Sequence, residues 1–140
     1  MSRRPQKTDA VTINNVSFAH EDMFEVVDTF YTRVQNDELL KVPFASVHDW
    51  PDHIDRLTHF WWIKFGGTPY LIPYYNPVEK HFFAGFNETL LERWLELFHQ
   101  TLNEKLNPEQ AKLWTMISER MGKALSFKNE AYRKYYEQQR

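Results

Sequence analysis

The stretch Met23-Phe24-Glu25-Val26-Val27-Asp28-Thr29-Phe30-Tyr31-Thr32-Arg33-Val34 decides the fold, because its apolar side chains recur at the spacing of an α-helix. Counted from the first, these apolar residues fall at positions +3, +4, +7, +8 and +11, which places them on one face of a helix. The members of this face are Met23, Val26, Val27, Phe30, Tyr31 and Val34. A helix with one apolar face must bury it against other elements, so the stretch predicts a helical domain with a core.

Two further helices are predicted from their ends. Pro51 suits the first position of a helix, and Gly66-Gly67 provides the flexible residues that commonly follow a C-terminus, so a helix is expected to about Phe65. Asn87 is a favourable N-cap for a helix running to about Asn103. A short helical turn is expected between these helices, around Glu79–Phe83.

The last helix has the clearest start signal. Asn107-Pro108-Glu109-Gln110 combines a capping residue, a proline at the first position, an acid near the positive dipole end and a glutamine that completes a capping box. Its expected buried stripe is Ala111, Trp114, Ile117, Ser118, Met121 and Leu125. No segment sustains the alternation of a strand, so the prediction is an all-α fold. It has a flexible arm over residues 1–16, a helical domain over 17–127 and a polar tail over 128–140.

The composition narrows the class of protein. The 140 residues are expected to form one domain, and the mixed 17 basic and 19 acidic residues argue against nucleic-acid binding. The chain has no run of about 18 apolar residues, so no membrane span is predicted. The basic start is not followed by the apolar stretch of a secretory signal, so a cytoplasmic protein is expected.

Aromatic residues make up 16% of the chain, whereas glycine occurs only 4 times. This balance indicates a core built around something flat and apolar, or a strongly aromatic protein interface. Neither a GxGxxG nor a GxxxxGK[ST] motif is present, which argues against the common nucleotide-binding enzymes.

The 6 histidines are the candidate metal ligands, because the chain has no cysteine. Zinc is weakly supported, since His53 and His59 point to different helix faces and no H-E-x-x-H motif occurs. Haem requires one imidazole and an apolar sleeve. His81 is followed closely by Phe82, Phe83 and Phe86, which fits that requirement.

Four segments together resemble the truncated haemoglobins, and their third group in particular. The first two are Phe30-Tyr31-x-Arg33-Val34 with Asp37-x-Leu39-Leu40 and Pro43-Phe44, and Trp50-x-x-His53 with Phe60-Trp61. The others are Lys80-His81 with Phe86, and Arg93-Trp94-Leu95-x-Leu97-Phe98-x-x-Thr101-Leu102. The resemblance spans roughly residues 23–125 and implies a two-over-two helical sandwich around haem.

The resemblance also implies a role for each matching residue. His81 would be the proximal iron ligand, with Phe86 nearby, and Tyr31, His53 and Trp94 would stand on the distal side. Phe44 would pack on the porphyrin, Arg56 would reach a propionate, and the pocket wall would comprise Leu57, Phe60 and Trp61. In a haem-free helical domain, however, the same apolar residues would serve as core, and Arg56 would be an ordinary solvated charge.

The implied function is reversible binding of O2, or of another diatomic ligand such as NO or CO, by haem b. The alternative is an enzyme that oxidises NO with O2 or reduces peroxide. Because the chain carries no recognisable flavin site, such turnover would need an external electron donor. A haem-free interaction module is the third possibility. The sequence does not indicate the oligomeric state.

Overall fold

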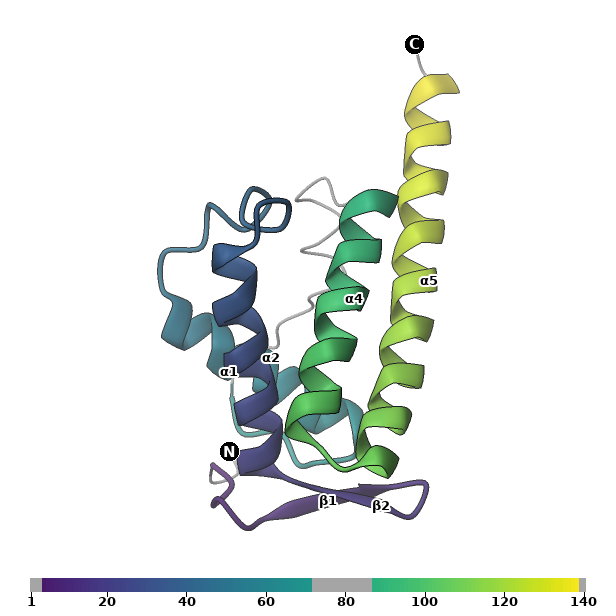
Figure 1. Cartoon of the computed structure of the whole chain (residues 1–140). Helices are drawn as coiled ribbons and strands as arrows, with labels where there is room; N and C mark the ends of the chain where they lie inside the picture. The colour runs from purple at the N-terminus through teal and green to yellow at the C-terminus, as the bar shows by residue number, and fades with distance from the viewer. Residues whose placement is uncertain (1–3, 72–86, 139–140) are drawn as a thin grey trace.

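The computed structural model describes residues 4–71 and 87–138, with side chains described up to Ala124. A two-stranded hairpin precedes the helices (Figure 1). The elements are β1 (Ala10–Ile13), β2 (Val16–Ala19), α1 (His20–Asn36), α2 (Trp50–Lys64), α4 (Glu88–Lys105) and α5 (Pro108–Gln138). In the described part of the chain, no helix combines the length and the apolar character needed to cross a bilayer.

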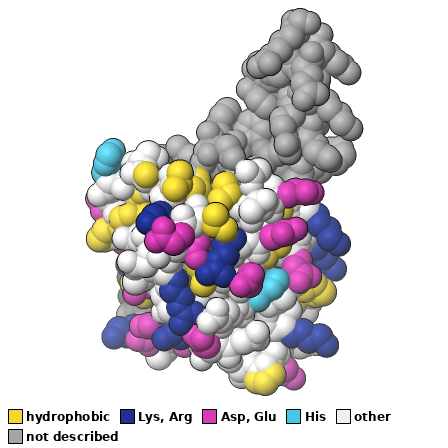
Figure 2. Space-filling model, turned by 45° about the horizontal axis from the view of Figure 1, so that its top comes forward, with side chains coloured by type: hydrophobic (Ala, Val, Ile, Leu, Met, Phe, Trp, Pro, Cys, Tyr) yellow, Lys and Arg dark blue, Asp and Glu magenta, His cyan; other side chains and the backbone are white. Residues whose placement is uncertain are grey.

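The helices pack as two pairs. Helix α1 packs on α2, α4 packs on α5, and the α1–α4 contact joins the pairs (Figure 1). This arrangement confirms the prediction of an all-α, two-over-two sandwich. On the face shown in Figure 2, basic and acidic side chains lie intermixed rather than in separate patches.

The buried side of α1 is the face predicted from the opening stretch. All six predicted residues are buried, and His20 at the start of the helix joins them. The helix ends at Asn36 because Asp37 adopts an extended backbone. The Asp37 carboxylate then accepts the backbone N–H groups of Leu39 and Leu40, which turns the chain into the corner before α2.

The remaining helices begin at capping side chains, of which Asn87 and Asn107 were predicted and Asp49 was not. The Asp49 side chain accepts from the Asp52 N–H ahead of α2, and Asn87 does the same for Leu90 ahead of α4. At α5 the predicted capping box is present in both directions. The Gln110 N–H donates to Asn107 Oδ1 at 2.9 Å, and the Asn107 N–H donates to Gln110 Oε1 at 3.2 Å.

The prediction that the chain has no strand is wrong. β1 and β2 pair antiparallel with Val11 opposite Phe18, and both of these side chains are buried. The turn is made by Asn14 and Asn15, whose φ angles of 49° and 65° are left-handed and suited to asparagine. Each strand has only four residues, too few to show a sustained alternation. β1 therefore belongs to the folded unit, although it lies within the predicted flexible arm, residues 1–16.

Gln110 also ties the hairpin to the helices. Its side-chain amide donates to the Ser17 carbonyl at 2.8 Å, so β2 is held against the start of α5. At the other end of α5, the helix continues to Gln138, and the predicted polar tail from residue 128 therefore begins within a helix.

Candidate functional site

Four rings meet where α1, the corner after it and the start of α2 come together. The centroid of the Tyr31 ring lies 5.8 Å from Phe44, 6.0 Å from Trp50 and 5.9 Å from His53. The Trp50 and His53 rings are themselves 5.3 Å apart. Tyr31 is only 2% exposed, so its side chain is buried beside these rings. The structure thus brings together three of the predicted site residues, Tyr31, Phe44 and His53.

Local chain geometry explains how α2 contributes to the cluster. Trp50 and His53 are three residues apart in the helix, so their side chains lie on one face. Trp50 was absent from the predicted site residues. Its spacing from His53 is the signal that identifies it.

The same face of α2 continues into the core. Leu57 follows His53 by one helical turn and is buried, and Phe60 is partly buried. The Trp61 ring stacks on Phe98 at 5.8 Å with an interplanar angle of 17°, and it lies 5.2 Å from Trp114. Trp61 therefore connects this face to the aromatic core between α2, α4 and α5.

Trp94, on α4, packs beside the ring cluster. Its ring lies 5.1 Å from Phe30, which in turn lies 4.7 Å from Tyr31. Trp94 also stacks on Phe98 at 4.8 Å. The indole is thus placed next to the ring cluster by Phe30 and Phe98.

Arg56 lies at the edge of this face. Its Nε donates to the Asp52 carboxylate at 2.9 Å, one turn earlier in α2. The predicted residues His81 and Phe86 lie outside the described residues. Within the described residues, no group of three or more His, Asp or Glu side chains is arranged to hold a metal ion.

A second cluster consists of polar side chains and joins α2 to the segment that follows it. This cluster was not predicted. His59 Nε2 accepts the backbone N–H groups of Tyr70 and Leu71, at 3.0 and 3.2 Å. His20 Nε2 is hydrogen bonded to the Tyr70 hydroxyl at 2.7 Å. Both histidines are buried, at 5% exposure for His20 and 2% for His59. These contacts fix the chain just after α2.

Burial governs the ionisation of this polar cluster. Burial, reinforced by the nearby Arg56 charge, lowers the pKa of His59. Burial, followed by the Arg4 charge, also lowers the pKa of His20. Burial raises the pKa of the Tyr70 hydroxyl to about 12. All three side chains are therefore neutral near pH 7.

An ion pair joins α4 to the corner after α1. Arg93 Nε donates to Asp37 Oδ1 at 2.8 Å, and the Asp37 side chain is only 10% exposed. Burial acts to raise the pKa of Asp37. The Arg93 guanidinium and the backbone N–H groups of Leu39 and Leu40 outweigh it and hold that pKa below its usual value.

Two packed helix pairs, with a ring-lined face of α2 turned toward α1 and α4, define a globin-type helical sandwich. The model of the bacterial-like globin family matches residues 18–126, and the chain belongs to that family. Among solved structures, it is similar to a group III truncated hemoglobin from Campylobacter jejuni, with a TM-score of 0.69 and 21% identity. That alignment covers 82% of this chain and 92% of the other. No match is found among curated protein sequences.

The chemistry of the described residues fits a haem pocket. The buried face of α1 and α2 offers flat apolar rings and a leucine, which suit a porphyrin. It also offers the Tyr31 hydroxyl and the His53 imidazole, 5.9 Å apart between ring centroids, as polar groups beside that surface. Apolar walls with a few placed polar groups are the usual composition of a cofactor pocket.

Proposed function

We propose that this globin binds haem b and, through it, reversibly binds O2. The observation that carries the proposal is the buried Tyr31 side chain, which lies among aromatic rings and next to the His53 imidazole. The hydroxyl is a hydrogen-bond donor, and the rings around it offer the flat apolar surface that suits a porphyrin. Haem, when bound, would supply the iron at which a diatomic ligand binds.

His81 is proposed as the proximal ligand. Its imidazole would have to be neutral to bind iron, and the phenylalanines that follow it in sequence would form the apolar surroundings. Further proposed haem contacts come from α2 and from the corner before it. Leu57 and Phe60 would line the porphyrin, with Phe44 at its edge, and Arg56 would exchange its pairing with Asp52 for a propionate.

Tyr31 and Trp94 are proposed as hydrogen-bond donors on the distal side. A phenol can donate its O–H, and an indole can only donate. With haem bound, these donors would favour retention of a diatomic ligand that takes up negative charge, such as O2.

His53 is proposed to control access to the same space. It is half-buried and lies at the start of α2, beside Trp50 and Phe44. An imidazole in this position can either rotate toward solvent or occupy the distal side itself. The resting absorbance spectrum separates the two, because direct ligation gives a low-spin spectrum that His53→Ala would abolish.

The test of the proposal is the absorbance of the purified protein, with and without His81→Ala. A Soret band in the parent protein that is lost or displaced in His81→Ala, and retained in His48→Ala, is the expected result. His48 is exposed and serves as the matched control. A parent protein that takes up no haem on reconstitution would overturn the proposal. An unchanged spectrum in His81→Ala would overturn the ligand assignment.

A further inference from the structure

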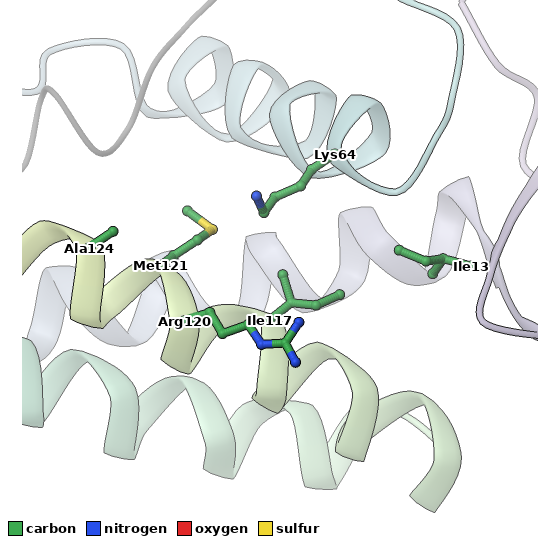
Figure 3. A pocket seen from close by; sticks show the side chains of 6 residues that line it. All are labelled: Ile13, Lys64, Ile117, Arg120, Met121 and Ala124. Atoms are coloured by element: carbon green, nitrogen blue, oxygen red, sulfur yellow. The ribbon is translucent and has the colours of Figure 1, made fainter.

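A cavity of about 350 Å³ lies between the end of α2, the middle of α5 and the tip of the hairpin (Figure 3). Its volume falls within the lower range of small-molecule sites. The lining residues are Ile13, Lys64, Ile117, Arg120, Met121 and Ala124. Four of these side chains are apolar and the other two are cationic. Among the described residues, none that lines the cavity carries a carboxylate.

The two cations come from different helices. Figure 3 shows the Lys64 side chain extending from α2 toward α5, and the Arg120 guanidinium lying beside Ile117 on α5. Both residues are exposed at the cavity, so an ion can reach them from solvent.

Neither cation is neutralised within the described residues. Arg120 contacts the Met116 sulfur at 3.9 Å, which offers no negative charge. The four other arginines with described side chains each pair with a carboxylate. Lys64 has no ion pair in the described part of the chain. The cavity is therefore a local positive site in a protein whose net charge is −2.

We propose that this cavity binds an amphipathic carboxylate, of the size of a medium-chain aliphatic acid. The carboxylate would lie between Lys64 and Arg120, where the guanidinium can form a charge-assisted hydrogen bond. The aliphatic body would cover Ile117 and Met121, whose burial adds a favourable apolar contribution. An inorganic anion would use the charges but leave the apolar lining uncovered.

None of the lining residues is a proposed haem contact, although Lys64 lies one helical turn after Phe60 in α2. Lys64 follows His53 by eleven residues in α2, which is about 16 Å along the helix. Lys64 also lies in the last turn of α2, where a cation favours the helix dipole. That role does not account for the second cation, Arg120, on another helix.

Methyl NMR of the full chain tests the proposal, using the reduced, CO-saturated protein labelled with [methyl-13C]methionine. The chain has 4 methionines. Met121 lines the cavity, Met23 is buried in the core and Met116 is exposed outside the lining, so the label carries its own controls. Loss of one signal in Met121→Leu assigns the reporter. Sodium decanoate is expected to shift the Met121 signal saturably and to leave the Met23 signal in place.

The matched variants are Lys64→Gln and Arg120→Gln, with Lys112→Gln as the control on an exposed face of α5. Each of the first two is expected to raise the Kd of decanoate about tenfold, and the control is expected to leave it unchanged. An unmoved Met23 signal shows that each variant remains folded.

Three results would overturn the proposal. The first is no saturable shift of the Met121 signal with decanoate. The second is equal binding of 1-decanol, which would show an apolar cavity without charge recognition. The third is inorganic phosphate binding as tightly as decanoate, which would show an anion site without use of the apolar lining.

Discussion

His59 holds Tyr70 by two contacts: its Nε2 accepts the Tyr70 backbone N–H at 3.0 Å, and the two rings meet edge to face at 4.6 Å. Because Nε2 is an acceptor, the ring proton of the neutral imidazole must be on Nδ1. Protonation of Nε2 would place two donors against each other. The contact therefore requires a neutral His59.

We expect the free energy of unfolding to fall as the pH drops below about 6.5. The folded-state pKa values of His59 and His20 are lowered, so the unfolded chain binds these protons more readily. The stabilisation is fully present above the unfolded-state pKa and is lost as pH falls toward the folded one. The loss is about 1.4 kcal/mol for each pKa unit of separation.

Urea unfolding at pH 7.5 and at pH 5.5 measures this effect. His59→Gln is expected to reduce the pH dependence, because glutamine accepts hydrogen bonds but does not titrate in this range. His48→Gln, at an exposed position, is the control and should keep the parent slope. Equal slopes in His59→Gln and the parent would count against a neutral, buried His59 as the cause.

Tyr31→Phe is expected to speed O2 dissociation about fivefold, because one net hydrogen bond is worth about 1 kcal/mol. Trp94→Phe is expected to act in the same direction. Stopped-flow displacement of O2 measures the rates. CO dissociation in the same variants is the control, since CO takes up little negative charge. Parent-like O2 rates in both variants would remove these side chains from the donor role.

Gly67→Ala is expected to destabilise the protein by about 2–3 kcal/mol, as overpacking does. A Cβ at this position would lie 2.3 Å from Nε1 of Trp62, whose ring packs against His20. Gly66→Ala is the informative comparison. Its φ of 101° strains any side chain, but the space around it is open, so a smaller cost of about 1 kcal/mol is expected. Denaturant unfolding ranks the two, and an equal or smaller loss in Gly67→Ala would contradict the close approach.

Arg93→Gln is expected to cost about 2 kcal/mol, because it leaves the poorly exposed Asp37 carboxylate without its cation. A double-mutant cycle with Asp37→Asn isolates the coupling between them. The matched control cycle is Lys41→Gln with Glu38→Gln, an exposed pair expected to couple by less than about 1 kcal/mol. Comparable coupling in the two cycles would show that burial of Asp37 has no effect.

The helices were predictable because their signals are local. The face from Met23 to Val34, the caps Asn87 and Asn107, and the stop at Gly66 each depend on residues within a turn or two of one another. The hairpin was missed because four-residue strands carry little periodicity. It depends on tertiary packing, because Phe18 is buried against Phe65 and Trp114 far along the chain.

The candidate site was predictable only in part. Periodicity places Tyr31 and His53 on buried or half-buried faces, but their approach depends on how α1 crosses α2, which no local pattern specifies. The contact of His59 with Tyr70 depends in the same way on the path of the chain after Gly67. Buried histidines that bond backbone groups carry no motif, and only their tertiary partners reveal them.

Helix α5 has 31 residues against 18 in α4, which makes the two about 46 and about 27 Å long. Figure 1 shows α5 projecting past the end of its partner. In the helix–coil transition, forming the first turn is the costly step, and the packed part of α5 has already taken it. The projecting turns are then added to that helix residue by residue. Each added residue then gains or loses little free energy, so the helix should shorten gradually from Gln138 on warming, well before the domain melts cooperatively.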